Sequence, residues 1–169
     1  MQHDPRAPGG QEFEELLSLL GRLNYVWTNT ESVLIHVIAG LARTDIDTAT
    51  LVFLTLNTTR ARINLVERLV KLERESDSLR KEILALTKRL SQALALRNKF
   101  NHCIYSFNAD DGSAQAILMR IQDRATQIQY GKSQAVNAGT IAKTEQVLDD
   151  LRDINDHLWA IILKQSYPI

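Results

Sequence analysis

The sequence predicts a mainly α-helical protein: a four-helix antiparallel bundle with a small β-hairpin inserted before the last helix. Three observations lead to this fold class. Four segments repeat apolar residues every three or four positions, and this period disappears between residues 104 and 140. Within that interval, Asp111-Gly112 is a typical hairpin turn. The composition, 44% hydrophobic and 24% charged over 169 residues, is that of one ordinary globular domain.

The ends and the composition of the chain lead to expectations about its organisation. Two of the three prolines and a Gly-Gly pair lie near the start, which predicts a disordered tail over residues 1–11 and a single domain over residues 12–166. One cysteine, Cys103, excludes a disulfide framework. No apolar run is long enough for a signal peptide or a membrane span. The sequence therefore predicts a cytoplasmic protein that does not enter a membrane.

The first two helices follow from apolar spacing and capping residues. The first is expected from Glu12 to about Leu41, and a break over residues 42–47 ends it. Asp47 or Thr48 is expected to cap a second helix that runs to about Glu73. The apolar positions that define the two faces are Leu16, Leu20, Leu23, Trp27, Leu34, Ile38 and Leu41, and then Leu56, Ile63, Val66 and Val70.

The third helix has the most regular period, and one charged residue interrupts it. Residues 76–78 form the break and the cap, and the apolar stripe then contains Leu79, Ile83, Leu86, Leu90 and Ala93. The next position of this stripe is Arg97. Burying a lone charge is costly, so Arg97 must be paired, lie at an edge, or line a cavity. Such local inconsistencies are typical of functional sites.

The interval after the third helix predicts strands. Residues 105–109 and 114–122 are expected to form the hairpin, and residues 126–133 a further strand. Thr140 is expected to cap the last helix, which runs to about Gln165. The apolar positions inside this helix are Ile141, Leu148, Leu151, Leu158 and Ile162.

The charge is balanced overall but not along the chain. Twenty basic residues offset twenty acidic ones, whereas residues 60–99 contain eleven basic and five acidic side chains. This local surplus is either a solvated face or an anion-binding surface, and the sequence leaves both open. Several well-known sites are absent from the sequence, including nucleotide-binding glycine loops, the HExxH zinc motif and paired Glu-x-x-His ligands. No metal site and no cofactor are predicted.

One short motif indicates a chemistry. It begins with Arg97 and Asn98, continues to His102, and is followed by Tyr105. An arginine fork can hold a phosphate, and a histidine can move a proton near neutral pH. Together they suit acid–base chemistry at a phosphate group. The same spacing occurs at Arg152 and His157, but aspartates fill that copy and would repel a phosphate.

The first motif, at the end of a bundle helix, resembles the signature of the HEPN superfamily. The resemblance implies a metal-independent endoribonuclease of a toxin, defence or stress system, with Arg97 and His102 as catalytic residues. It also implies a homodimer in which both Arg-His pairs line one cleft. Apolar residues beside the main stripe of the first helix independently predict a dimer: Val26, Val33 and Val37. RNA and an antitoxin or other neighbouring-gene product are the expected partners.

Other interpretations stay open at this stage. The protein can instead be a non-catalytic RNA-, nucleotide- or protein-binding bundle, or a purely structural one. Arg97 can form a salt bridge, for example to Glu31, and His102 can simply stabilise a helix end. Asn98 and Tyr105 are candidates for binding substrate, although Tyr105 can also serve hairpin packing. Glu31 belongs to a polar-aromatic cluster with Asn24, Trp27 and Thr28, and is a candidate for supporting the site indirectly.

Overall fold

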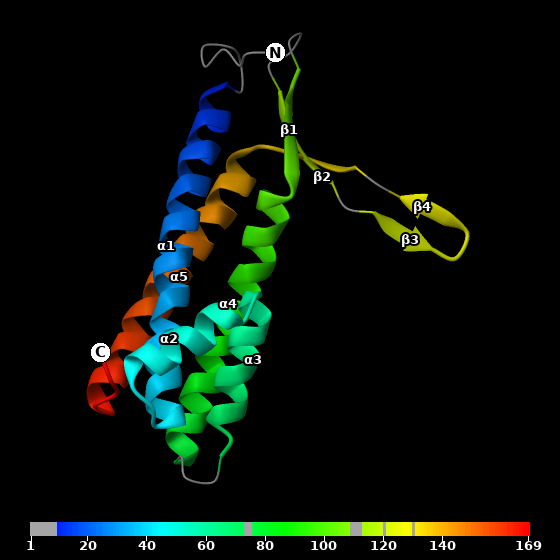
Figure 1. The fold of residues 1–169 in the computed structure, drawn as a ribbon. Helices are drawn as coiled ribbons and strands as arrows, with labels where there is room; N and C mark the ends of the chain where they lie inside the picture. Colours follow the sequence, from blue (N-terminus) through cyan, green and yellow to red (C-terminus); the bar gives the residue numbers. More distant parts are fainter. Residues whose placement is uncertain (1–9, 73–75, 109–112, 120, 130) are drawn as a thin grey trace. The chain divides into compact units, whose positions relative to one another are not determined.

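The structure, a computed structural model, describes residues 10–72, 76–108, 113–119, 121–129 and 131–169. The chain divides into two compact units. We call residues 1–24 with 94–148 the sheet-bearing unit, and residues 25–93 with 149–169 the helical unit. Figure 1 shows the helices and strands along the chain. The helices are α1 (Gly10–Ala42), α2 (Ile46–Thr55), α3 (Thr59–Leu69), α4 (Asp77–Asn101) and α5 (Ala138–Lys164), and the strands are β1 (Cys103–Phe107), β2 (Ala114–Leu118), β3 (Gln122–Arg124), β4 (Gln127–Gln129) and β5 (Lys132–Ala135).

The predicted mainly α class is confirmed for the described residues, with a small antiparallel sheet in the predicted interval. The predicted tail lies outside the described residues up to position 9, and α1 begins at Gly10. Helix α4 begins where the sequence indicated, because the Ser76 hydroxyl accepts a hydrogen bond from the Leu79 N–H at 3.2 Å. The single domain expected over residues 12–166 stays a prediction.

The predicted second helix is wrong in two respects, because the structure has two helices there. The first, α2, is capped by Asp45 rather than by Asp47 or Thr48, and the Asp45 carboxylate accepts from the Thr48 N–H at 2.8 Å. The chain then becomes extended at Leu56 and Thr58. The Thr58 hydroxyl caps α3 by accepting from the Ala61 N–H at 3.1 Å. A threonine side chain that binds the backbone in this way competes with a continuous helix.

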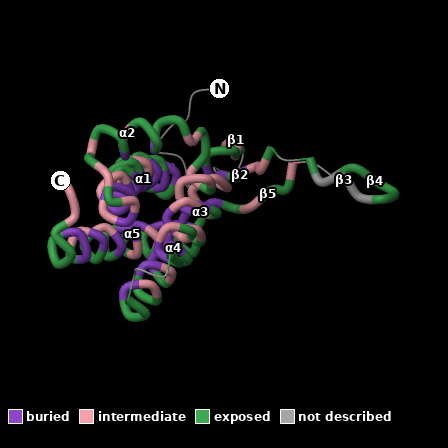
Figure 2. The backbone as a smooth tube through the Cα atoms, turned by 60° about the horizontal axis from the view of Figure 1, so that its bottom comes forward, coloured by how far each residue is buried: buried purple, intermediate pink, exposed green. Residues whose placement is uncertain are grey.

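The helical unit is built around apolar helix faces. In Figure 2 buried stretches alternate with exposed ones along the helices, as amphipathic patterning requires. Trp27 is the largest of the fully buried side chains. Leu56, predicted for the face of the second helix, is only half-buried. The buried apolar residues of this unit include the other predicted positions and further residues: Trp27, Leu34, Ile38, Leu41, Ile63, Val66, Val70, Leu79, Ile83, Leu86, Leu90, Ala93, Leu151, Ile154, Leu158 and Ile162.

The sheet-bearing unit contains the predicted hairpin, extended by a third strand. Strands β1 and β2 pair antiparallel, with Cys103 opposite Leu118 and Phe107 opposite Ala114, and β5 pairs with the other edge of β2. The predicted Asp111-Gly112 turn lies outside the described residues. The strand predicted over residues 126–133 is wrong as a single element, because β4 pairs with β3 in a separate two-stranded sheet while β5 joins β2. Gly131, between them, has a φ of 70°, a conformation that glycine adopts without steric cost.

Alternation along β1 determines which side chains cover the core of this unit. Tyr105 and Phe107 are half-buried, whereas Ile104 and Ser106 are exposed. The Phe13 ring of α1 contacts the Tyr105 ring at 5.8 Å and the Phe107 ring at 6.4 Å between centroids. The aromatic side of β1 therefore packs on the first turns of α1, and the end of α4 is anchored directly beside it.

The last helix also begins earlier than predicted. Helix α5 starts at Ala138, so Thr140 lies inside the helix and is not its cap. The Asn137 side chain accepts from the Thr140 N–H at 3.1 Å, and the Thr140 hydroxyl donates to the Ala135 carbonyl at 3.1 Å. Asparagine is among the best helix-capping residues, and the buried Thr140 hydroxyl instead ties the helix start to β5.

Candidate functional site

The candidate site lies where α4 ends and β1 begins, within the sheet-bearing unit. His102 connects the two elements: its N–H donates to the Asn98 carbonyl at 3.2 Å, which closes the last turn of the helix. Its own carbonyl accepts from the Met119 N–H at 3.0 Å, which extends the β1–β2 ladder by one residue. Both backbone groups of His102 are thus fixed, while its side chain is exposed. The imidazole is therefore carried by a fixed backbone at the junction of α4 and β1.

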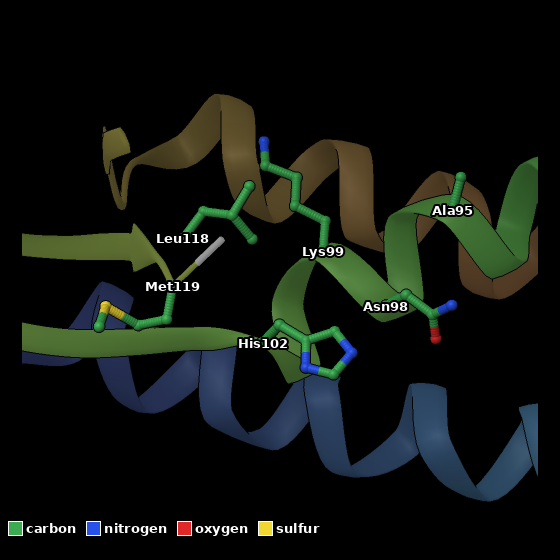
Figure 3. A pocket seen from close by; sticks show the side chains of 6 residues that line it. All are labelled: Ala95, Asn98, Lys99, His102, Leu118 and Met119. Atoms are coloured by element: carbon green, nitrogen blue, oxygen red, sulfur yellow. The ribbon is translucent and has the colours of Figure 1, made fainter. Parts of the chain in front are cut away.

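A cavity of about 530 Å³ opens beside this histidine. Its volume is in the range of small-molecule sites in proteins. In Figure 3, His102 and Asn98 extend from the end of α4, and Leu118 and Met119 come from the neighbouring strand. The described lining residues are Ala95, Asn98, Lys99, His102, Leu118 and Met119. One wall is thus polar and basic, and the other is apolar.

Lys99 is a lining residue that the sequence did not single out. Its ammonium donates to the side-chain carbonyl of Gln134 on β5, and the Gln134 amide donates to the Thr140 hydroxyl at 3.4 Å. An ammonium has three donor hydrogens, so the bond to Gln134 leaves capacity for an anion. Lys99 lies inside the predicted motif, but only the position of β5 shows what holds its charge.

Arg97 interrupts the apolar stripe of α4 as predicted, and it is half-buried. Its Nε donates to the Asn24 side-chain oxygen at 3.1 Å, and one terminal nitrogen donates to the Asn98 side-chain oxygen at 3.3 Å. The same Asn24 oxygen accepts from the Asn101 amide at 3.2 Å. Arg97 is not among the described residues that line the cavity. The structure thus links Arg97 to the cavity through Asn98, which touches both.

Tyr105 makes packing and hydrogen-bonding contacts within the sheet-bearing unit. Its hydroxyl donates to the Phe100 carbonyl at 3.2 Å, and its ring packs on Phe13. Burial, together with the nearby Cys103 thiol, raises the pKa of Tyr105 to about 12. Burial also raises the pKa of Cys103, against the opposing effect of Lys99, and the Cys103 thiol donates to the Lys99 carbonyl at 3.1 Å.

The pKa of Tyr105 predicts how stability changes at high pH. A phenol whose pKa is higher in the folded than in the unfolded state contributes stability that is complete below about pH 10. This contribution is lost as the pH rises through about 12. We expect urea denaturation to show a smaller loss of stability between about pH 9.5 and 12 for Tyr105→Phe than for the wild type. An equal loss in both proteins would contradict this assignment.

Glu31 belongs to the helical unit, where it forms a buried polar cluster. Its carboxylate accepts from the Trp27 indole at 3.0 Å and from an Arg62 terminal nitrogen at 2.8 Å. The Arg62 Nε donates to the Phe53 carbonyl at 3.1 Å, and the guanidinium lies 4.0 Å above the Phe53 ring centroid. Of the predicted polar-aromatic cluster, Trp27 and Glu31 are hydrogen-bonded to each other, and Arg62 joins them, whereas Asn24 bonds to Arg97 in the sheet-bearing unit. The sequence did not indicate Arg62 as a partner of Glu31, 31 residues away.

The second copy of the motif is located in the helical unit. Arg152 forms an exposed ion pair with Asp149 at 2.9 Å, and His157 lies 3.3 Å from the Asp153 carboxylate. Aspartates surround both residues, as the sequence indicated. Arg89 lies 2.7 Å from Asp153, and its hydrogen bond lowers the pKa of that carboxyl group. This copy is a set of surface ion pairs.

The basic surplus of residues 60–99 is partly neutralised by ion pairs. Arg62 pairs with Glu31, Arg80 with Asp77, and Arg89 with Asp150 and Asp153. Other basic residues of this stretch are exposed, namely Arg60, Arg68, Lys71, Lys81 and Lys88. Within the described ranges, no group of three or more His, Cys, Asp or Glu side chains is arranged to hold a metal ion. None of the described helices combines the length and apolarity needed to cross a bilayer.

Comparisons with models of known protein families, with curated proteins and with solved structures find no match for this chain. The resemblance to the HEPN signature therefore rests on residues 97–105 of the sequence and stays a prediction. The cavity beside His102 is independent of that resemblance, because it follows from the structure of the sheet-bearing unit.

Proposed function

We propose that the protein is a HEPN-like endoribonuclease that cleaves RNA by attack of the 2′-hydroxyl on the adjacent phosphate. The observation that carries this proposal is the cavity lined by an exposed histidine, His102, together with Asn98 and Lys99. In Figure 3 the His102 imidazole and the Lys99 ammonium extend in different directions from the end of α4. A histidine supplies proton transfer, and a fixed cation stabilises the negative charge that grows on the phosphate. The expected setting is a cytoplasmic toxin, defence or stress response.

Each group has a role in the reaction. His102 accepts the proton of the 2′-hydroxyl, whose oxygen forms a bond to phosphorus. The leaving 5′-oxygen takes a proton from the protonated His102 of a second copy or from water. The bond between phosphorus and the 5′-oxygen breaks, which leaves a 2′,3′-cyclic phosphate and a 5′-hydroxyl end. Asn98 and Lys99 hold the phosphate oxygens, and Arg97 holds Asn98 or reaches the phosphate itself.

The four-helix antiparallel arrangement and the homodimer stay parts of this proposal. Val33 and Val37, two of the three valines from which the sequence predicted a dimer, are buried within the chain, so the dimer rests on the spread of the motif. Residues five apart on an α-helix point about 140° away from each other and lie about 7.5 Å apart along the axis. One Arg97–His102 pair is therefore widely spread for a single phosphate. Two copies that pack with these residues facing each other would supply both a histidine and an arginine to one cleft. An antitoxin or other neighbouring-gene product would then act by covering this cleft.

Cleavage of a labelled single-stranded RNA in the presence of EDTA tests the function. We expect fragments that end in 2′,3′-cyclic phosphate, and no cleavage at a position where a 2′-deoxynucleotide replaces the ribonucleotide. Because the 2′-hydroxyl is the nucleophile, cleavage at the deoxy position would contradict the mechanism. Activity that appears only after a divalent cation is added would also contradict it.

A non-catalytic RNA- or nucleotide-binding protein is the second candidate. The observation that favours it is the engagement of the Arg97 guanidinium by Asn24 and Asn98, which makes this arginine part of a folded network. Fluorescence anisotropy distinguishes the two functions. Binding of the labelled RNA without any fragments, under conditions in which the protein remains folded, would favour the binding protein.

A further inference from the structure

We propose that the cavity beside His102 is a subsite for one nucleotide of a single-stranded RNA, with the base on Leu118 and Met119 and the phosphate at the polar wall. This inference rests on the proposed function, since it assigns the part of the substrate that the same site would hold. The two walls have different chemistry, and the bound group must match both.

The register of the β1–β2 pair determines where the two residues of the apolar wall, Leu118 and Met119, lie. Leu118 is opposite Cys103 in the β1–β2 ladder, and the Met119 N–H donates to the His102 carbonyl at 3.0 Å. Both side chains are therefore held next to the end of α4. Met119 is 56% exposed, so its side chain is accessible to a ligand in the cavity. A flexible thioether adapts to flat partners such as a nucleobase.

The polar wall matches a phosphate. His102 and Asn98 supply hydrogen-bonding groups, and Lys99 supplies a positive charge. The Lys99 ammonium donates to Gln134, which is not among the described lining residues, so it contacts a bound phosphate by turning toward the cavity with its remaining donor hydrogens. Ala95 completes the lining, and its small side chain leaves space in the cavity. A cation, hydrogen-bond donors and an apolar surface within one cavity suit a group that is both anionic and flat.

The size and the walls together favour an unpaired nucleotide. A cavity of about 530 Å³ is the size of a site for one small molecule, and an apolar wall contacts a base only when the base is not stacked in a helix. Single-stranded RNA presents its bases in this way, whereas a duplex covers their faces. The structure thus points to a loop or a single strand as the substrate.

Calorimetric titration of the full chain with adenosine 3′-monophosphate, ribose 5-phosphate and inorganic phosphate tests this subsite. We expect the nucleotide to bind about tenfold more tightly than ribose 5-phosphate, because only the nucleotide buries a base on the apolar wall. Met119→Ser should remove most of this difference, and Met119→Leu should retain it. Since Met119 is largely exposed, both variants should fold, and their thermal melting should match that of the wild type.

Ile121→Ser is the matched control, because Ile121 is 68% exposed, lies two residues further along the chain, and is not among the described lining residues. It should bind the nucleotide as the wild type does. Lys99→Gln should weaken binding of all three ligands, since it removes the charge that faces the phosphate. Equal affinity for the nucleotide and for ribose 5-phosphate would overturn the subsite, as would unchanged nucleotide binding in Met119→Ser.

These experiments distinguish failure of the nucleotide subsite from failure of the proposed endonuclease activity. If the nucleotide binds as expected but no RNA is cleaved, the subsite stands and the endonuclease is wrong. If RNA is cleaved and Met119→Ser changes neither nucleotide binding nor the choice of cleavage position, the endonuclease stands and the base-binding wall is wrong.

Discussion

Replacing His102 with alanine is expected to lower the rate of RNA cleavage by roughly 10²- to 10⁴-fold, because proton transfer contributes about that much to catalysis. The His102 side chain is exposed, and its backbone bonds to Asn98 and Met119 do not require the imidazole. The variant should therefore fold and still bind RNA. Rates of cleavage of a labelled RNA, with binding measured by anisotropy, separate the two effects.

His157→Ala is the matched control for this experiment. Both histidines are exposed and follow an arginine by five residues, but His157 lies beside Asp153 on α5 and is not among the described residues that line the cavity. It should cleave as the wild type does. Arg97→Ala should reduce both binding and cleavage, whether the guanidinium contacts phosphate or acts through Asn98. Full activity of His102→Ala would contradict the assignment of the catalytic residue.

Replacing Arg62 with alanine is expected to lower the free energy of unfolding by about 3 kcal/mol, because it leaves the Glu31 carboxylate buried without its cation. The two side chains are only 18% and 12% exposed and their charged atoms lie 2.8 Å apart. The variant also loses the bond to the Phe53 carbonyl and the contact with its ring. Urea denaturation followed by circular dichroism measures this change.

Arg152→Ala is the control for the Arg62 experiment. Its ion pair with Asp149 has side chains that are 54% and 69% exposed, so the expected loss is at most about 0.5 kcal/mol. The double variant Glu31→Gln/Arg62→Ala should be more stable than the sum of the single changes indicates, because the neutral glutamine amide leaves no unpaired charge in the cluster. Arg62→Ala with wild-type stability would show that the network does not hold the helical unit together.

The helices could be predicted from local patterns because the periodic apolar residues of each helix are buried against other elements. Every apolar position predicted for the first helix, from Leu16 to Leu41, is buried. The division between α2 and α3 was missed, since apolar residues continue at helical spacing across the break. The extended backbone at Leu56 and the capping bond of Thr58 decided it, and an apolar period does not record such competition between side chain and backbone.

The candidate site could be predicted only in part. Arg97 was found because it interrupts an apolar stripe, and His102 because of its spacing from Arg97. Leu118 and Met119 gave no signal, since apolar residues in a strand are ordinary. Their position beside His102 depends on the β1–β2 register, which connects residues that are distant along the chain.

The sequence by itself determined the helical class, the interval that contains the sheet, and the arginine that does not fit its stripe. These properties arise from residues within one or two turns of each other, where periodicity and capping act. Only the tertiary structure decided that Arg97 bonds to Asn24 and Asn98, that Lys99 is held by Gln134, and that Glu31 pairs with Arg62. The partner of a polar side chain is a group that the fold brings within hydrogen-bonding distance. The sequence contains several other residues that could have served as partners of the same chemical type. Packing selects among them, because a buried charge or hydrogen-bonding group must be satisfied where the fold places it.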